Sequence, residues 1–292
     1  MLLQRFYEGM RMELLMFSKM LKNIGNLTVV ESGKYIAQMG FDGVDLTVRP
    51  GGHVSPQEAS EKLPKAVETL NSKGLNVPMI TSSITSADEK FAAEIFKAAS
   101  ECGVKFIKLG YWRYEGFGTI KRQIEDVRND NLRGLSKLSE EFNVTAGLHI
   151  HSGDFLTSNA AVVYLLLRDY DPQYLCAYID PGHMAVEGGL SGWKIGMDLL
   201  REHIRMVAVK DFGWFQEVDP ETGEKRWVAR VVPLSEGLVP WMEVFSYLKR
   251  INFNGPVSLH SEYHDVDLQG LIRRTKADLQ YLKGTLKRLN MI

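Results

Sequence analysis

Histidines and carboxylates recur at short, even spacings in the second half of the chain. His149 and His151 are two residues apart, as are His260 and Glu262, and Asp180 lies between these pairs in the sequence. Residues two apart on a β-strand point to the same side. Neutral imidazoles together with a carboxylate are a common ligand set for zinc, manganese or iron. We therefore predict a metal site formed by His149, Asp180 and His260.

The metal prediction depends on the fold, because the sequence contains no local signature such as HExxH. The identity of the metal, Mn, Zn, Mg or Fe, stays open. The same three residues can instead form an electrophilic hydrogen-bonding site without a metal. Any one of the histidines, taken alone, can also be an ordinary core or loop residue.

Four further residues are candidates for proton transfer: Lys210, His151, His183 and Glu262. A histidine needs only a small pKa shift to act as a base near neutral pH. A lysine that faces the inside of a barrel is partly desolvated, which lowers its pKa and favours a base or a Schiff-base nucleophile. The alternative for Lys210 is an ion pair with Asp180 or Glu262.

Loop residues that follow the apolar runs are candidates for substrate binding. They are Arg49, His53, Trp112, Arg113 and Trp214. The aromatic run Tyr111, Trp112 and Tyr114 follows a strand and is interrupted by an arginine, which favours a binding wall over a helical core stripe. Aromatic faces combined with scattered polar donors suit a sugar, which has apolar C–H faces and many hydroxyl groups.

The elements that must position these residues are eight short apolar runs. They occupy 13–17, 43–48, 76–82, 106–110, 145–150, 175–180, 206–211 and 257–260. Six of their seven spacings lie between 30 and 39 residues, and the last is 51. About 30 residues is the length of one strand with its crossover helix and loops.

Segments with helical spacing lie between the runs, as in the face formed by Leu63, Ala66, Val67 and Leu70. Right-handed crossovers on eight parallel strands leave two solutions, an open doubly wound sheet or a closed barrel. Eight evenly repeated units favour a single (β/α)₈ barrel. No linker or change of composition divides the chain, so we predict one domain over residues 1–292.

The long spacing after the seventh run contains a predicted β-hairpin. The turn sequence Asp-Pro-Glu-Thr-Gly at 219–223 separates the strand-like segments 215–218 and 225–232. The hairpin would lie over the C-terminal mouth, where barrel active sites occur. It forms either a wall of the site or a surface decoration. Asp211, which precedes it, is predicted to be structural, a carboxylate that accepts loop N–H groups.

Composition excludes several classes of protein. Lys+Arg is 35 and Asp+Glu is 36, so the net charge is −1, whereas nucleic-acid binders carry a basic surplus. No apolar run approaches the ~18 residues of a membrane span. The first residues lack the pattern of a signal peptide. With only Cys102 and Cys176, we expect reduced thiols and a cytoplasmic protein.

Phosphate-binding motifs are absent from the sequence. It has no GxxxxGK[ST] and no GxGxxG after a strand. Barrel phosphate sites usually follow the seventh or eighth strand, but the loop after the eighth, 261–265, is acidic. We therefore expect a neutral or carboxylated sugar as the substrate.

Several motifs resemble the xylose isomerase-like barrels, a family that includes sugar phosphate isomerases and epimerases, inosose dehydratases and endonucleases that cut at abasic sites. The motifs are GFDGVDL, GLHIHSGDF, YIDPGH, VAVKD, VPLSEGLVPW and GPVSLHSEY. The resemblance extends from about Glu13 to Leu289 and implies a TIM barrel. It is specific for the family and uninformative about the substrate.

The resemblance also implies a ligand set. Many members bind one divalent metal through a Glu, an Asp, a His and a Glu on the fifth to eighth strands, and the two glutamates move protons. Here Asp180 keeps the Asp position, with His183 as its companion. His149 and His260 stand at the Glu positions, and Ala208 stands at the His position. These departures argue against the two-glutamate mechanism and imply a variant site.

We predict an enzyme that abstracts a proton next to a carbonyl group of a sugar or ketosugar, as an isomerase or epimerase. A lyase or hydratase acting on an oxidised glycoside starts with the same step and stays open. So does a non-catalytic sugar-binding barrel, which the missing glutamates favour and the remaining titratable groups oppose. A small carbohydrate is the expected partner, without nucleic acid or membrane, and a homo-oligomer stays open.

Overall fold

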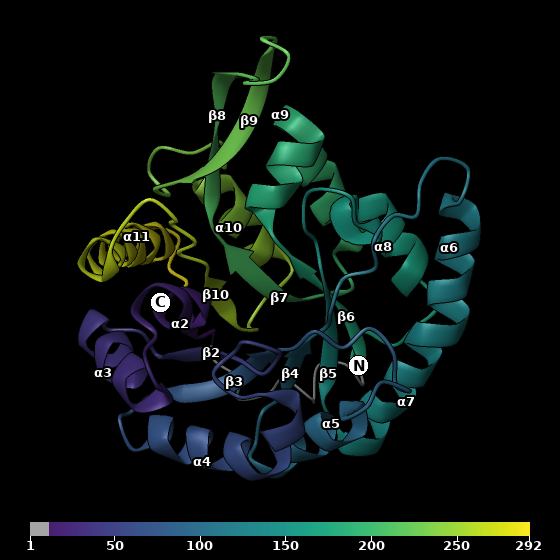
Figure 1. The fold of residues 1–292 in the computed structure, drawn as a ribbon, viewed down its shortest axis with the longest axis vertical. Coiled ribbons are helices and arrows are strands. Elements are labelled where there is room, and N and C mark those ends of the chain that lie inside the picture. The colour runs from purple at the N-terminus through teal and green to yellow at the C-terminus, as the bar shows by residue number, and fades with distance from the viewer. Residues whose placement is uncertain (1–11) are drawn as a thin grey trace.

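The computed structural model describes residues 12–292, and its centre is a closed barrel of eight parallel strands (Figure 1). The barrel strands are β1 (Leu14–Phe17), β2 (Gly43–Thr47), β3 (Asn76–Thr81), β4 (Phe106–Lys108), β5 (Thr145–His149), β6 (Leu175–Ile179), β7 (Ile204–Val209) and β10 (Val257–Leu259). Around the barrel they run in the order β1-β10-β7-β6-β5-β4-β3-β2. The predicted (β/α)₈ fold is confirmed.

Each predicted apolar run coincides with a barrel strand, although β7 begins two residues before its run. Most strands end before the run does, and several of the residues that follow them are polar and turn into the next loop or helix. β6, for example, ends at Ile179, and Asp180 then accepts a hydrogen bond from the backbone N–H of His183 at the start of the next helix. The polar residues that the sequence marked thus stand at the rim of the barrel.

Helices form the outer ring of the barrel (Figure 1). They are α2 (Lys19–Gly25), α3 (Val29–Met39), α4 (Ala59–Asn71), α5 (Ala92–Glu101), α6 (Ile120–Asp126), α7 (Leu132–Phe142), α8 (Ala160–Leu167), α9 (Pro181–Leu200), α10 (Trp241–Arg250) and α11 (Leu268–Arg288), with short turns η1 (Pro56–Glu58), η2 (Val127–Asn131) and η3 (Leu156–Ser158). Within residues 12–292 no helix combines the length and the apolarity of a membrane span. Residues 1–11, where no signal peptide was expected, lie outside the described part.

Two apolar cores follow from the alternation of side chains along the strands. Leu14 and Met16 of β1 belong to the large core between the barrel and the helices, together with the α4 face predicted from the sequence. Leu15 belongs to a small separate cluster inside the barrel, together with Phe106 and Met206. The interior is therefore apolar at its base, and the polar strand ends occupy its mouth.

Helix α9 is divided by a break at Gly189, whose φ of 61° and ψ of −146° are not helical. A positive φ of this kind is accessible to glycine at little cost. The first segment of α9 begins directly after Asp180 and carries His183. This segment is therefore short and fixed to the barrel rim, while the rest of α9 packs as a separate helix.

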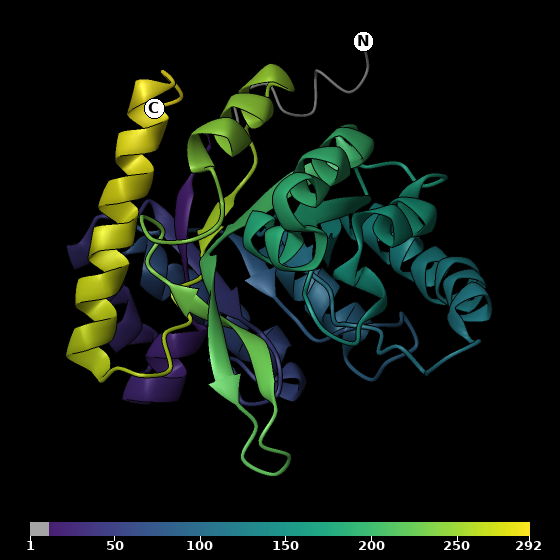
Figure 2. The same ribbon diagram turned by 90° about the horizontal axis from the view of Figure 1, so that it is seen from above.

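The predicted hairpin is confirmed as β8 (Asp211–Val218) paired antiparallel with β9 (Lys225–Val232). Its first strand starts at Asp211, four residues earlier than the sequence pattern indicated. Figure 2 shows the hairpin extending beyond the barrel at the end where α11 begins, which is the C-terminal mouth.

One buried carboxylate closes the base of the hairpin. Asp211 accepts hydrogen bonds from the backbone N–H of Phe212 at 2.8 Å, of Leu238 at 2.8 Å and of Val239 at 3.1 Å. It also accepts one from Nε1 of Trp241 at 2.8 Å. The structural role predicted for Asp211 is confirmed, and one side chain ties both ends of the insertion to α10.

The close approach at Asp211 makes a first prediction. A Cβ atom at Gly237 would lie 2.0 Å from Cγ of Asp211, so the loop has to shift in Gly237→Ala. We expect this variant to lose about 1–3 kcal/mol of unfolding free energy in urea titrations. Gly284→Ala is the control, because its Cβ meets nothing within 4 Å in α11. That variant should gain about 0.5–1 kcal/mol, and equal effects of the two substitutions would contradict the analysis.

Candidate active site

A cavity of about 80 Å³ lies at the C-terminal mouth of the barrel. Every barrel strand except β6 contributes a residue to its wall, at or just after the end of the strand. The cavity is lined by Phe17, Lys19, Arg49, Thr81, Lys108, Tyr111, His149, His151, Lys210, His260 and Glu262. This is the position at which the active sites of TIM-barrel enzymes are built.

His149, Asp180 and His260 converge at one side of this cavity. All three are buried, and each offers a ligand atom within 4.8 Å of the others. Nε2 of His149 lies 3.4 Å from Oδ2 of Asp180, and Nε2 of His183 lies 3.8 Å from the same oxygen. The three predicted metal ligands therefore meet in space although they are 31 and 80 residues apart in the chain.

The ligand atoms in this group lack hydrogen-bond partners within the described part of the chain. They are Nε2 of His149, Oδ2 of Asp180, Nε2 of His183 and Nδ1 of His260. Buried polar atoms without partners are rare and costly. Three of these atoms belong to His149, Asp180 and His260, and one carboxylate with two imidazoles is a donor set for a divalent metal, so the residues present fit a metal ion.

The opposite edges of the same side chains are held in place. Nδ1 of His149 lies 2.7 Å from the hydroxyl of Tyr111, and Nε2 of His260 lies 3.0 Å from the hydroxyl of Tyr178. Such outer contacts fix the orientation of a metal-binding imidazole. Burial holds the pKa of His149 well below its ordinary value, so the ring is neutral, as a metal ligand must be.

Glu262 joins two lysines by ion pairs. Its Oε2 lies 2.6 Å from Nζ of Lys210, and its Oε1 lies 2.5 Å from Nζ of Lys19. Nζ of Lys210 also lies 3.6 Å from Oδ2 of Asp180. Burial by itself lowers the pKa of Lys210, but the two carboxylates outweigh burial and raise it. The prediction of a lowered pKa for Lys210 is therefore wrong, because the structure contains the alternative arrangement, in which Lys210 forms ion pairs with Asp180 and Glu262.

His151 is a neutral imidazole with a defined proton. Its Nδ1 lies 2.9 Å from the carbonyl oxygen of Ser152. A carbonyl oxygen only accepts, so Nδ1 carries the hydrogen and Nε2 carries the lone pair. Burial and the charge of Lys210 lower the pKa of His151 to about 4. His151 packs against His183, with ring centroids 4.0 Å apart, and His183 in turn contacts the hydroxyl of Ser152.

The five predicted substrate-binding residues are divided by the structure. Arg49 lines the cavity, and the other four do not. Trp112 is buried in the core outside the barrel, and Arg113 lies over the ring of Phe155 at 5.4 Å. Trp214 is a half-exposed residue of β8. Two-residue periodicity ends with the strand, so it could not give the direction of the loop residues Trp112 and Arg113, and Trp214 belongs to the hairpin strand β8.

His53 is held away from the cavity by two hydroxyl groups. Its Nε2 lies 3.1 Å from Oγ of Ser32, and its Nδ1 lies 3.0 Å from Oγ1 of Thr47. Its backbone N–H also donates to Oγ1 of Thr47 at 2.9 Å, because the loop folds back on the strand end. Burial, then the charge of Lys22, lowers the pKa of His53 to about 4.

Four residues of the cavity lining were not predicted from the sequence: Phe17, Lys19, Thr81 and Lys108. Tyr178, which contacts His260 but lies outside the lining, was not predicted either. Lys108 ends β4, and its ammonium lies 3.5 Å from the centroid of the Tyr111 ring. Tyr178 stands two residues before Asp180, so period two already placed it on the same side of the strand. Lys19 carried no such signal, since its partner Glu262 is 243 residues away.

A groove of about 630 Å³ adjoins the cavity and shares Glu262 with it. Phe212 and Phe215 of the hairpin form one wall, and Tyr263 and Arg274 form part of the other. The hairpin therefore forms one wall of the groove that adjoins the mouth cavity.

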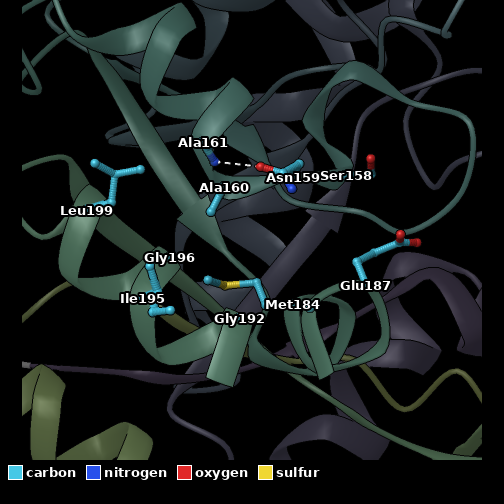
Figure 3. Close-up of a pocket in the computed structure, with 11 residues that line it drawn as sticks. Ser158, Asn159, Ala160, Ala161, Met184, Glu187, Gly192, Ile195, Gly196 and Leu199 are labelled. Atoms are coloured by element: carbon cyan, nitrogen blue, oxygen red, sulfur yellow. Dashed lines mark hydrogen bonds between the residues drawn. The ribbon is translucent and has the colours of Figure 1, made fainter. Parts of the chain in front are cut away.

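Another cavity, of about 250 Å³, lies between α8 and α9 (Figure 3). Its walls are mainly small or apolar residues such as Met184. The charged residue in its lining, Glu187, accepts a hydrogen bond from the backbone N–H of Gly153 at 3.0 Å. Asn159 accepts one from Ala161, as Figure 3 shows. Glu187 is the one titratable side chain in this lining, so the cavity lacks the cluster of titratable groups that lines the mouth of the barrel.

Comparison with known proteins places this geometry in context. A family model described as the xylose isomerase-like TIM barrel matches residues 34–285. Among solved structures, 3-keto-D-glucoside 4-epimerase from E. coli is 15% identical, with a TM-score of 0.66 and coverage of 94% of this chain and 100% of that chain. A search of curated proteins gave no significant match.

Two further structures share the fold. A probable 3-DHS dehydratase from Bacillus anthracis is 17% identical, with a TM-score of 0.68 and coverage of 93% of this chain and 99% of that one. A xylose isomerase-like protein from Mycobacterium smegmatis, solved in complex with magnesium, is 15% identical, with a TM-score of 0.67 and coverage of 96% and 98%.

The buried state of His53 generates a prediction about pH. Above pH 6.5 the ring is neutral in both the folded and the unfolded chain. Between pH 6.5 and about 4 only the unfolded chain takes up the proton, so unfolding free energy is lost as the pH falls. We expect His53 to contribute about 2–3 kcal/mol to this loss. Urea titrations across that pH range should give a shallower slope for His53→Gln, and parallel curves would contradict the assignment.

Proposed function

The chain belongs to the xylose isomerase-like TIM barrel family, and on that premise we propose an enzyme that removes a proton next to the carbonyl group of a sugar or ketosugar. The proposed reaction is an isomerisation or epimerisation. The observation that carries the proposal is a neutral imidazole, His151, and a cationic amine, Lys210, in the wall of one cavity. Two groups with opposed protonation states are the usual mark of acid–base chemistry.

His151 is the proposed proton acceptor. The hydrogen bond from its Nδ1 to the carbonyl of Ser152 leaves the lone pair on Nε2. Removing a proton from the carbon next to a carbonyl gives an enolate, and the proton moves to Nε2. Glu262 is the weaker acceptor, because Lys210 and Lys19 overcome the effect of its burial and hold its pKa well below the ordinary value.

Lys210 is the proposed donor to the oxygen on which negative charge develops. Its ion pair with Glu262 keeps it protonated and fixes the direction of its Nζ. A positioned cation stabilises the negatively charged enolate oxygen more than the neutral carbonyl oxygen of the substrate, and so lowers the activation free energy of proton removal. His183, in ring contact with His151, is the proposed second proton carrier, which can return a proton to another atom of the substrate.

A lyase reaction remains the second candidate, since it begins with the same enolate and ends with loss of a group from the neighbouring carbon. The specific observation in its favour is the groove at Glu262, which offers space for a leaving group next to the cavity. The similarity to a probable dehydratase of the same fold is compatible with it.

We propose His149, Asp180 and His260 as the residues that would hold a divalent metal, with His183 beside them. A metal there would supply a Lewis acid for a substrate oxygen. Oδ2 of Asp180 lies 3.4 Å from Nε2 of His149 and 3.6 Å from Nζ of Lys210, so Asp180 would serve both the metal group and the proposed donor. The identity of the metal is part of the test below.

Two further proposals concern the whole chain. Residues 1–292 are proposed to form one domain, because barrel closure pairs β1 with β10 and so joins the two ends of the chain. A cytoplasmic location is proposed because Cys102 and Cys176 are free thiols, as expected in a reducing compartment.

The proposed function predicts exchange of a carbon-bound proton with solvent. Ketoses, aldoses and 3-keto-glycosides incubated with the protein in D₂O should incorporate deuterium next to the carbonyl, measured by NMR. Lys210→Met should keep the fold and lower the exchange rate by ~10²–10⁴, the scale for losing a positioned donor. Epimerisation and elimination give different NMR products, so the same spectra separate the two candidate reactions.

The control separates catalysis from stability. If Lys210 is only an ion-pair partner, Lys210→Met loses several kcal/mol of unfolding free energy because a buried carboxylate is left unpaired, while turnover of the folded fraction is unchanged. That result, measured as thermal midpoint and turnover on the same preparation, would remove Lys210 from the mechanism. Binding of sugars without exchange in any of them would favour a non-catalytic barrel.

The proposed metal site predicts metal content. Protein loaded with Mn, Zn, Mg or Fe and then desalted should retain about one ion per chain by elemental analysis. His149→Ala should retain far less, with an unchanged circular dichroism spectrum, since a three-ligand site loses one donor. His264→Ala is the control, because His264 is exposed and outside the group. Equal loading of His149→Ala and the parent protein would refute the site.

A further inference from the structure

The wall of the mouth cavity carries more positive than negative charge. Four of its lining residues are cations, Lys19, Arg49, Lys108 and Lys210, and one is a carboxylate, Glu262. Glu262 forms its ion pairs with Lys19 and Lys210. Among residues 12–292, neither Arg49 nor Lys108 has a carboxylate within the 4.0 Å of an ion pair. Two cations in one cavity are thus left without an ion-pair partner within the described residues.

Of these two cations, Lys108 is the more deeply buried, so the burial of its charge costs more free energy. Its side chain is only 2% exposed, and its ammonium lies over the ring of Tyr111 at 3.5 Å. The charge of Asp45 acts on Lys108 only from beyond ion-pair distance, and that carboxylate accepts hydrogen bonds from Thr81 and Ser258, both at 2.8 Å. Burial, then the charge of Arg49, holds the pKa of Lys108 well below its ordinary value. An anion in the cavity would offset both effects.

Arg49 presents its guanidinium to the same cavity. It lies 5.8 Å from the centroid of the Phe17 ring, a contact with an aromatic face that leaves its N–H donors free for a ligand. A guanidinium has five N–H donors in a planar fork that matches the geometry of a carboxylate. The Arg49 side chain is partly exposed and therefore lies nearer the entrance of the cavity, whereas Lys108 is buried and lies deeper.

We propose that Arg49 and Lys108 form a subsite for a carboxylate group of the substrate, so that the substrate class is sugar acids. This inference rests on the proposed function for the reaction that follows binding. Arg49 follows β2 and Lys108 ends β4, whereas His151 and Lys210 follow β5 and β7. The two pairs therefore occupy different halves of the strand ring, and a carboxylate held by the first pair directs the rest of the sugar toward the second.

A carboxylate fits this subsite better than a phosphate ester. Phosphate sites in barrels use backbone N–H groups at a helix N-terminus after the last strands. Here β7 runs into the hairpin, and the loop after β10 contains Glu262 and Asp265. Two side-chain cations without such a backbone cradle suit a planar monoanion.

Matched ligands test the subsite by isothermal titration calorimetry. D-Fructose, D-fructuronate and D-fructose 6-phosphate differ only at C6, which is a hydroxymethyl, a carboxylate or a phosphate ester. We expect the carboxylate to bind about tenfold to hundredfold more tightly than the neutral sugar, the scale of one or two charge-assisted hydrogen bonds. Arg49→Met and Lys108→Met should each reduce this preference at least tenfold. Arg113→Met, an arginine outside the cavity, should keep it.

The outcomes separate the subsite from the reaction. Equal or absent binding of the carboxylate relative to the neutral sugar overturns the subsite, as does tighter binding of the phosphate ester. An unchanged preference in both Arg49→Met and Lys108→Met overturns it as well, and thermal melts establish that both variants are folded. A carboxylate preference without deuterium exchange supports the subsite and overturns the proposed function. Exchange on neutral sugars without that preference supports the function and overturns the subsite.

Discussion

Charge compensation by Glu262 is the interaction on which the arrangement of the mouth depends. A closed barrel brings the ends of eight strands together, so every charged residue at the mouth is close to several others and partly removed from water. Glu262 forms ion pairs with Lys210 and Lys19 at once, and its charge, together with that of Asp180, keeps Lys210 protonated. Because the lysines are satisfied there, Oδ2 of Asp180 remains free of hydrogen bonds and faces the histidines.

Sequence periodicity predicted the part of this site that lies on strands. The spacing of two between His149 and His151, and the position of Asp180 at a strand end, were sufficient to bring the metal-type residues together once the barrel was recognised. Periodicity says nothing about the direction of loop side chains, so it could not place Trp112, and it did not reveal that Trp214 belongs to the hairpin strand β8. It also says nothing about partners distant in the chain: the pKa of Lys210 is raised by Glu262, 52 residues later, and no local pattern contains that pair.

The resemblance to the family implies that His149 and His260 stand at glutamate positions, and in the proposed metal site this difference would change the charge of the cavity. A metal bound by one carboxylate and two neutral imidazoles keeps a net charge of +1, whereas a site with three carboxylates would give −1. This positive net charge has the same sign as the charges of Arg49 and Lys108, which have no ion-pair partner among the described residues. The composition of the ligand set and the preference for a substrate charge are therefore two aspects of one electrostatic arrangement.

The hydrogen bonds of Asp211 have a consequence for how this barrel can change over evolution. Asp211 and Leu238 are 27 residues apart, yet one side chain fastens the entry and the exit of the hairpin. The entropy of closing a loop grows only slowly with its length, so the fastened ends make the length between them nearly free to vary. The hairpin is thus an exchangeable module: insertions, deletions or a grafted segment at its tip alter the wall of the mouth without disturbing the register of β7 and β10.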